Sequence, residues 1–338
     1  MSSVLVDSSS FVPNLESCVG RSELQFRRNE PRRNAIRIGL LGHGTIGRTV
    51  ADAASSYGAE IISVLVRNTE RRPPSSLNFE RDGSRVLNSR PDVVVEALGG
   101  LEPARTLVAA ALDRGIPVVT ANKSLIAAHG PELRGRAALA GVPLLYDAAV
   151  IAGVPFVGAL ANRPGLRTLT SITGILNGTS HVITSALERG VPFDAALADA
   201  QARGYAEPDS SADISGRDAA EKLAILLQLC GAPNTTAADI TCVGIDTLTP
   251  DDFAAARAQG GVIKPVATAT LGPGGWTGRV GPAVISQMHL FAGLSGVTNA
   301  LELHPAVGAP ITFVGPGAGP AITAQTILDD VIQACGHE

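Results

Sequence analysis

The strongest structural signal in this chain is the segment IRIGLLGHGTIGRTVADAA, residues 36–54. It begins with a short apolar run that is typical of a buried strand and continues from Thr45 with helical spacing. Between the two, Gly42, Gly44 and Gly47 stand in GxGxxG spacing. This spacing is informative because it follows a strand and opens a helix. We therefore predict a strand, loop and helix that bind a dinucleotide; the alternative is a glycine-rich turn without a ligand.

Each residue of this loop has a defined part in the predicted cofactor site. Gly42 permits a tight turn, Gly44 lets the backbone approach a pyrophosphate, and Gly47 lets the helix pack closely on the strand. Thr45 and Ile46 begin the helix, whose free N–H groups and positive dipole end favour phosphate. We expect these five residues to bind the cofactor.

The end of the second expected strand indicates which dinucleotide is bound. An NAD-selective site carries Asp or Glu about 20 residues past the glycines, where it holds the ribose 2′-hydroxyl. This chain has Arg67 and Asn68 there, followed by Arg71 and Arg72. Guanidinium groups suit a 2′-phosphate through charge-assisted, bidentate contacts. We therefore expect NADP(H) to be preferred, with NAD(H) possible; the alternative is a solvated cluster of surface arginines.

Short apolar runs alternate with helical segments after residue 35, which predicts a parallel sheet covered by helices on both faces. From about residue 149 longer strands, helices and clusters of glycine and proline follow instead. The expected fold is α/β, a Rossmann-type doubly wound parallel sheet with a second α+β domain.

The same change of pattern predicts the domain limits. We expect residues 1–34 to be a mobile leader and residues 35–150 to form the NAD(P)-binding domain, joined by about residues 310–338. Residues 151–309 would form the second domain. We do not expect feedback inhibition through an added C-terminal domain.

Composition excludes several classes of function. The net charge is −4 with both signs spread along the chain, so no nucleic-acid partner is expected. No apolar run reaches the ~20 residues that a membrane span requires. The four cysteines are scattered and form no CxxC pair, which favours free thiols in a reducing compartment. We expect a cytoplasmic protein whose partner is a small molecule.

A second signal is GYAEPDSSADISGRDAAEKLAILLQLC, residues 204–230. Asp218 and Lys222 are four residues apart and share one face of the expected helix. The helix is apolar nearly all round from Leu223, which implies burial, and buried charges are costly unless they are paired or used. Carboxylates around one lysine suit an amino-acid substrate's ammonium group and the movement of a proton.

A purely structural explanation of the same residues is open. Ser215 and Asp218 have the spacing of a capping box, and Asp218 with Lys222 makes a favourable helical ion pair. Capping does not explain the carboxylates just upstream, Glu207, Asp209 and Asp213. The spacing alone does not decide between the two readings.

These segments, taken together and in order, resemble homoserine dehydrogenases over roughly residues 36–332. Members of that family reduce L-aspartate 4-semialdehyde to L-homoserine with NADPH or NADH, on the route to threonine and methionine. The matching segments are GHGTIG (42–47), EALGGLEPA (96–104), VTANK (119–123), YDAAVIAGVPF (146–156), GILNGTS (174–180), GYAEPDSSADISGRDAAEK (204–222), GVTNA (296–300) and GPGAG (315–319).

The resemblance implies a role for several residues. Lys222 is similar to the family's proton donor to the aldehyde oxygen. Lys123 is similar to the second lysine, which lies between the nicotinamide and the substrate. Glu207 and Asp218 resemble the carboxylates that bind the substrate, with Asp213 as a helper in the same cluster.

The resemblance also implies a monovalent cation, usually sodium. Its ligands would be the side chain of Asp147 and the carbonyl oxygens of Val150, Ala152 and Val154. Gly317 would return to the cofactor. The resemblance implies that the second domain, residues 151–309, serves substrate binding, catalysis and dimerisation, and that a homodimer forms through its sheet.

Some residues depart from the family pattern and leave alternatives open. The family commonly has Glu at the position of Asp147 and Asn at that of His181; His181 is either a ligand contact or a structural histidine. With Ile151, these changes motivate the alternative of a paralogue that acts on a related amino-acid semialdehyde. A non-catalytic NADP-binding sensor is a further alternative, which the presence of both Lys123 and Lys222 disfavours.

Overall fold

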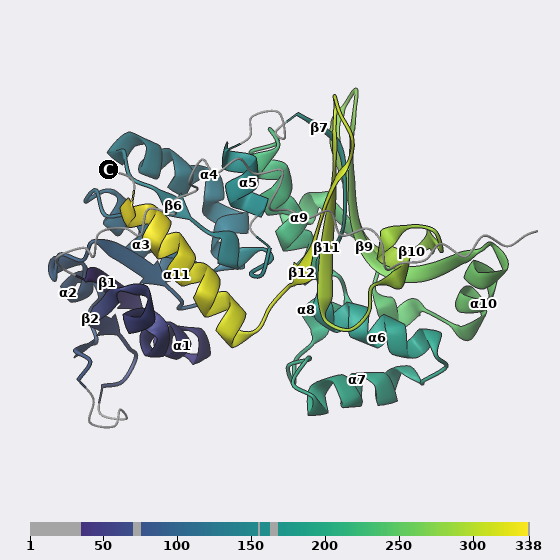
Figure 1. Cartoon of the computed structure of the whole chain (residues 1–338), viewed down its shortest axis with the longest axis horizontal. Coiled ribbons are helices and arrows are strands. Elements are labelled where there is room, and N and C mark those ends of the chain that lie inside the picture. Colours follow the sequence, from purple (N-terminus) through teal and green to yellow (C-terminus); the bar gives the residue numbers. More distant parts are fainter. Residues whose placement is uncertain (1–34, 70–75, 155, 163–167, 337–338) are drawn as a thin grey trace, which may run out of the picture. The chain divides into compact units, whose positions relative to one another are not determined.

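The structure is a computed structural model that describes residues 35–69, 76–154, 156–162 and 168–336, with the side chains of residues 161–162 left aside. The leader expected at residues 1–34 and the arginines Arg71 and Arg72 lie outside the described residues. From Ile36 onward the chain forms one compact unit built on two sheets (Figure 1).

The first sheet has six strands, all parallel, in the order β3-β2-β1-β4-β5-β6. The strand order reverses between β1 and β4, and dinucleotides bind at the carboxyl ends of strands at such a point. The predicted doubly wound parallel sheet is confirmed. Its strands are β1 (Ile36–Leu41), β2 (Ala59–Leu65), β3 (Phe79–Glu80), β4 (Val93–Glu96), β5 (Val118–Thr120) and β6 (Leu144–Leu145).

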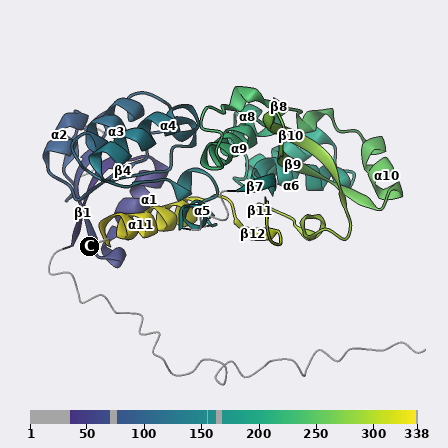
Figure 2. The ribbon, with the colours of Figure 1, turned by 90° about the horizontal axis from the view of Figure 1, so that it is seen from above.

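Helices cover this sheet on both faces because its strands are apolar on both sides. On β4, Val93 and Val95 pack in a cluster with residues of α1 and α11, whereas Val94 packs in another cluster with residues of α3 and α4. Helix α11 contacts α1, and the two lie side by side in Figures 1 and 2. The elements around the sheet are α1 (Thr45–Ala53), η1 (Ala54–Tyr57), α2 (Gly83–Asn88), α3 (Ala104–Leu112), α4 (Lys123–Ala140), η2 (Asp147–Ala149), α5 (Phe156–Asn162) and α11 (Pro320–Gly336).

The second sheet is mixed, with the order β12-β11-β7-β9-β10-β8. Its neighbouring strands are antiparallel except for β8 and β10, which pair in parallel. The strands are β7 (Leu169–Ile175), β8 (Ile240–Cys242), β9 (Gly261–Gly272), β10 (Gly275–Ser286), β11 (Thr298–Pro305) and β12 (Ile311–Pro316). The accompanying helices are α6 (Gly178–Glu188), α7 (Phe193–Ala202), α8 (Ser211–Ile214), α9 (Arg217–Leu229) and α10 (Pro250–Ala258), with the short turns η4 (Ala237–Asp239), η5 (Ile245–Thr247) and η6 (Leu290–Gly293).

Strands β11 and β12 are not evident in the sequence, because only their pairing with neighbouring strands identifies them. Strand β12 pairs with β11 and therefore belongs to the second sheet. The chain thus returns toward the first sheet after Pro316, later than the expected position near residue 310. Within the described ranges, no helix is both long enough and apolar enough to cross a membrane.

Candidate active site

The glycine loop between β1 and α1 has the geometry that its spacing predicts. Gly42 has a φ of +106°, and a Cβ there would lie 2.5 Å from the Ala97 carbonyl oxygen. A Cβ at Gly47 would collide with the Gly42 carbonyl oxygen. A Cβ at Gly44 would meet nothing within 4 Å, so the space above this residue is open. The loop therefore fits a group that approaches the backbone at Gly44.

The start of α1 is open to an anion. Thr45 and Ile46 are its first residues, its N-cap is Gly44, and no side chain caps the helix in the described part of the chain. The uncapped N–H groups suit a phosphate group. Arg67 is exposed two residues after the end of β2, at the position expected to contact the ribose. These residues fit a dinucleotide.

Two lysines from different helices, α4 and α9, meet at one carboxylate. Lys123, the first residue of α4, donates a hydrogen bond to Asp218 Oδ1, and Lys222 Nζ lies 3.2 Å from Asp218 Oδ2. Lys222 also donates to the Leu176 carbonyl oxygen at 2.7 Å. All three side chains are mostly buried, at 25% (Lys123), 14% (Asp218) and 11% (Lys222) exposed. We call these three residues the lysine cluster.

Asn177 organises the acidic side of the lysine cluster. Its Oδ1 accepts the Ser180 N–H at 2.7 Å and so caps α6. Its Nδ2 is then left to donate to Asp213 Oδ1 at 2.6 Å and to Asp218 Oδ2 at 2.8 Å. The orientation of the amide therefore follows from the helix cap. The sequence interpretation missed Asn177, although an Asn just before a helix is a recognisable capping signal.

Glu221 is a second residue that the sequence interpretation missed. Its Oε2 lies 3.3 Å from Lys123 Nζ, and it accepts a hydrogen bond of 3.2 Å from Ser124 Oγ. Its position next to Lys222 is visible in the sequence. Its contact with Lys123 joins two helices and cannot be seen in the sequence.

The electrostatics of the lysine cluster keep Asp218 and Lys123 charged. Burial alone would raise the pKa of Asp218, but Lys222 and Lys123 outweigh it and hold that pKa well below its usual range. Burial likewise opposes charge on Lys123, whereas Asp218 and Glu221 raise its pKa above the ordinary value. Burial raises the pKa of Asp213. The site thus contains one firmly ionised carboxylate beside one that holds its proton more tightly than usual.

The structure also separates the two readings of the helix that begins near Asp218. The N-cap of α9 is Gly216, with no side-chain cap, and Ser215 Oγ donates instead to the Ser211 carbonyl oxygen at 2.6 Å. The capping box considered from the sequence is therefore not formed. The ion pair of Asp218 with Lys222 is formed, but Asp218 also binds residues far away in sequence.

Glu207 lies apart from these contacts. It is exposed, and among the described residues its carboxylate has no hydrogen-bond or ion-pair partner. Its backbone carbonyl oxygen accepts a hydrogen bond from Ser210 Oγ at 2.7 Å. Its expected role in binding substrate therefore stays a prediction.

A network of buried hydrogen bonds around one carboxylate orients the helix that begins with Lys123. Glu96, at the end of β4, is fully buried and accepts hydrogen bonds from Thr120 Oγ1 and Asn122 Nδ2. Asn122 caps α4 by accepting the Leu125 N–H at 3.1 Å. Burial raises the pKa of Glu96. This network orients the first turn of the helix that begins with Lys123.

The residues expected around a monovalent cation lie in and after η2. Asp147 is 7% exposed, and its Oδ1 accepts the Gly158 N–H at 3.3 Å. The carbonyl oxygen of Ala152 accepts from Thr326 Oγ1, and that of Val154 accepts the Phe156 N–H at 2.8 Å. Burial raises the pKa of Asp147 to about 6.

The remaining expectations concern Gly317 and His181. The Gly317 carbonyl oxygen accepts the Ala152 N–H at 3.2 Å, and a Cβ at Gly317 would collide with the side chain of Asn299. His181 is fully buried, with Nδ1 3.2 Å from the Thr298 carbonyl oxygen and Nε2 3.5 Å from Lys264 Nζ. Burial and Lys264 lower the pKa of His181 to about 4, which favours the structural reading of this histidine.

Comparisons with family profiles and with known sequences agree on one protein family. A family profile described as homoserine dehydrogenase matches residues 155–332, and one described as homoserine dehydrogenase, NAD binding domain, matches residues 39–147. A homoserine dehydrogenase of Corynebacterium glutamicum is 36% identical over 90% of this chain and 73% of its own length. One of Synechocystis sp. is 37% identical over 89% of this chain and 73% of its own length.

Solved structures give the same result. A homoserine dehydrogenase from Thiobacillus denitrificans superposes with a TM-score of 0.81 at 35% identity, covering 89% of this chain and 73% of that one. The two sheets and their helices are therefore shared with enzymes of that name.

Proposed function

The chain belongs to the homoserine dehydrogenase family and is an oxidoreductase that uses a nicotinamide cofactor; we propose that it reduces L-aspartate 4-semialdehyde to L-homoserine with NADPH as the preferred cofactor. The observation that carries this proposal is the lysine cluster. It joins Lys123, at the carboxyl edge of the first sheet, to Lys222 on a helix of the second sheet through one ionised carboxylate.

Each residue of the site has a separate role in the proposed reaction. Lys222 donates a proton to the aldehyde oxygen as negative charge develops there, since an ammonium group near that oxygen can act as a general acid. Asp218 and Asn177 hold Lys222 and Lys123 in place, and Asp218 with Asp213 and Glu207 attracts the substrate's ammonium group. The nicotinamide, when bound, supplies the hydride to the carbonyl carbon.

The preference for NADPH rests on Arg67. This exposed guanidinium follows β2, where an NAD-selective site has a carboxylate. A 2′-phosphate would accept bidentate hydrogen bonds from it. Gly42, Gly44 and Gly47, with the uncapped N–H groups at Thr45 and Ile46, would hold the pyrophosphate.

A monovalent cation is a further part of the proposal. Asp147 is a buried carboxylate for which the described residues offer no basic partner, and the neighbouring carbonyl oxygens suit a hard cation. Asp147 and the carbonyl oxygens of Val150, Ala152 and Val154 would hold a sodium ion and stiffen the connection between the sheets.

We propose a homodimer in the cytoplasm. The second sheet leaves the large apolar side chains of Leu271 on β9 and Val284 on β10 exposed, and the strand register places them on one face. Covering such a surface against a second copy would remove it from water. Sedimentation at several protein concentrations tests this part.

A steady-state assay of cofactor oxidation tests the main proposal. Aspartate semialdehyde should be turned over, and NADPH should give a higher kcat/KM than NADH. Arg67→Gln should lower kcat/KM for NADPH by about ten- to a hundredfold, as expected for a lost charge-assisted contact, and leave NADH nearly unaffected. Faster turnover of a longer semialdehyde would favour the paralogue, and NADPH binding without any turnover would favour the sensor.

A further inference from the structure

A fully buried carboxylate, that of Glu96, lies at the carboxyl end of β4. In the register of the first sheet, Glu96 is level with Leu41, the last residue of β1, and with Thr120, the last residue of β5. The strand order reverses between β1 and β4. Glu96 therefore lies at the part of the sheet where dinucleotides bind.

The hydrogen bonds of Glu96 fit its ionised form. Its Oε1 accepts the Leu98 N–H at 2.8 Å and a hydrogen bond from Asn122 Nδ2 at 3.4 Å, and its Oε2 accepts the Thr120 hydroxyl. The Thr120 oxygen itself accepts the Asn122 N–H at 3.0 Å, which directs the hydroxyl proton at Glu96. All of these partners donate, and an ionised carboxylate only accepts. They oppose the effect of burial, which raises the pKa of Glu96.

The negative charge of Glu96 has neutral partners only. Within the described residues, no lysine, arginine or histidine lies within ion-pair distance of its carboxylate. Hydrogen bonds from amides and a hydroxyl stabilise the charge but do not cancel it. A charge that is screened poorly by water acts more strongly on its surroundings than an exposed one. Glu96 thus contributes an uncompensated negative charge at the carboxyl edge of the first sheet.

Two features on either side of Glu96 limit where the reactive half of the cofactor can lie. On one side is the glycine loop, since a Cβ at Gly42 would lie 2.5 Å from the carbonyl oxygen of Ala97, the residue after Glu96. On the other side is Asn122, which donates to Glu96 and directly precedes Lys123 of the lysine cluster. The loop suits the pyrophosphate, and the hydride has to reach a substrate beside the lysine cluster. The nicotinamide ring therefore has to lie between these features, over the ends of β4 and β5.

We propose that Glu96 stabilises the oxidised form of the cofactor relative to the reduced form, an inference that rests on the proposed function. The nicotinamide ring is neutral in NADPH and becomes singly positive when its hydride passes to the carbonyl carbon, while the oxygen takes a proton from Lys222. A nearby buried negative charge stabilises the positive ring and leaves the neutral ring almost unaffected. The same charge favours the transition state, in which part of the positive charge has developed.

Titrations of the full chain with NADPH and with NADP+, followed by calorimetry, test this role. The decisive quantity is the Kd for NADP+ divided by the Kd for NADPH. A purely structural loss at the loop would weaken both forms together and leave this ratio unchanged. Glu96→Gln, which keeps the shape of the side chain, should raise the ratio about tenfold or more, as expected for one charge pair in a poorly solvated place. An unchanged ratio would overturn the proposal.

Two control variants separate charge from shape. Glu96→Asp keeps the charge on a shorter side chain, so it should weaken both forms alike and leave the ratio near that of the unaltered protein. Glu60→Gln removes an exposed carboxylate of β2 and should change neither constant, because water and salt screen that charge. A ratio that rose as much in Glu96→Asp as in Glu96→Gln would contradict a role for the charge.

Thr120→Val provides the same test if Glu96→Gln does not fold. Valine has nearly the shape of threonine but lacks the hydroxyl donor, so the Glu96 carboxyl group should hold its proton more tightly. The ratio should then rise about threefold or more at neutral pH, and an unchanged ratio would overturn the proposal. If the unaltered protein bound neither form, the proposed function would fail together with this inference. Binding of both forms with an unchanged ratio in the variants would contradict the role of Glu96 alone.

Discussion

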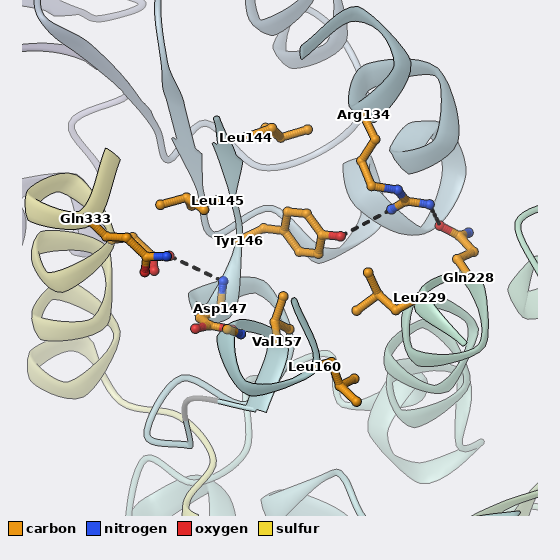
Figure 3. Close-up of a pocket in the computed structure, with 12 residues that line it drawn as sticks. Arg134, Leu144, Leu145, Tyr146, Asp147, Val157, Leu160, Gln228, Leu229 and Gln333 are labelled. Carbon is orange, nitrogen blue, oxygen red and sulfur yellow. Dashed lines mark hydrogen bonds between the residues drawn. The ribbon is translucent and has the colours of Figure 1, made fainter. Parts of the chain in front are cut away.

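The lysine cluster and the pair of carboxylates Asp147 and Asp330, beside η2 and α11, both lie in poorly solvated places, but only the lysine cluster pairs its charges within the described residues. Asp218 lies against two ammonium groups and accepts a hydrogen bond from Asn177. The Asp330 carboxylate accepts the Asp147 backbone N–H (Figure 3), and the Asp147 carboxylate accepts the Gly158 N–H. Burial therefore has different outcomes in the two places: the lysines outweigh its effect on the pKa of Asp218, whereas it raises the pKa of Asp330 to about 8.

The difference indicates two kinds of site. In the lysine cluster, the charges are compensated within the protein, so the groups are held in position before a substrate arrives. At Asp147 and Asp330, compensation has to come from protons or from a cation such as the sodium ion proposed at Asp147. The first arrangement suits a reaction that needs a fixed proton donor, and the second suits binding of a cation.

The largest effect is expected for Lys222→Ala. Removing the proton donor should lower kcat by about 10²–10⁴-fold, while the dissociation constant for NADPH, measured by fluorescence titration, stays nearly unchanged. Lys222→Arg is the matched control, because arginine keeps the positive charge beside Asp218 but does not release its proton near neutral pH. Restored turnover in Lys222→Arg would contradict the role of Lys222 as proton donor.

A smaller effect is expected for Asp218→Asn, which leaves two poorly solvated ammonium groups facing an amide. Unfolding by urea should show a loss of about 1.5–3 kcal/mol. Because the folded pKa of Asp218 is below its ordinary value, its stabilisation is present above the unfolded pKa and is lost as the pH falls through the folded pKa. The variant should therefore lose less stability on acidification than the unaltered protein. If the unfolding free energies of the variant and the unaltered protein changed in parallel between about pH 2 and pH 5, the pairing of Asp218 with the lysines would contribute nothing to stability.

Asn177→Asp tests whether the amide positions the carboxylates. Aspartate keeps the cap of α6 but exchanges two N–H donors for a third negative charge beside Asp213 and Asp218. We expect kcat/KM to fall about tenfold and the acid limb of its pH profile to move upward, since a nearby like charge raises carboxyl pKa values. Asn177→Ser keeps a capping oxygen without adding charge, and its acid limb should not move. An unaltered pH profile of kcat/KM in Asn177→Asp would show that Asn177 serves only as the cap of α6.

The smallest effect on turnover is expected for Asp330→Asn, whose consequence lies in the pH dependence of stability. The folded pKa of Asp330, about 8, is above its ordinary value because of burial and of Asp147. Its contribution to stability is therefore fully present below the unfolded pKa, about 4, and is lost as the pH rises through about 8. The amide side chain of the variant has no such proton to lose, so its unfolding free energy should decline less between about pH 5 and pH 9. Equal declines in both proteins would show that Asp330 is not an uncompensated carboxylate.

Local sequence patterns were sufficient for the first sheet and for the glycine loop. Strand β1 and the start of α1 follow directly from the apolar run and the helical spacing around Gly42 to Gly47, because each depends on neighbours in sequence. Strands β11 and β12 did not emerge, because their identity depends on pairing with β7 and with each other. In the site, local spacing was only partly sufficient: the ion pair of Asp218 with Lys222 formed, whereas the equally local capping box did not.

By itself, the sequence determined the parallel sheet with its cofactor loop, the family and the identities of the two lysines, since these depend on residues at short, fixed spacing. The tertiary structure alone decided that Lys123 meets Asp218, which is 95 residues away. It also decided that Asn177 and Glu221 join them, and that Asp147 meets Asp330 across 183 residues. The reason is physical: periodicity reports which side of an element is buried, but only the packing of distant elements determines which charges are paired there and which are left for a ligand.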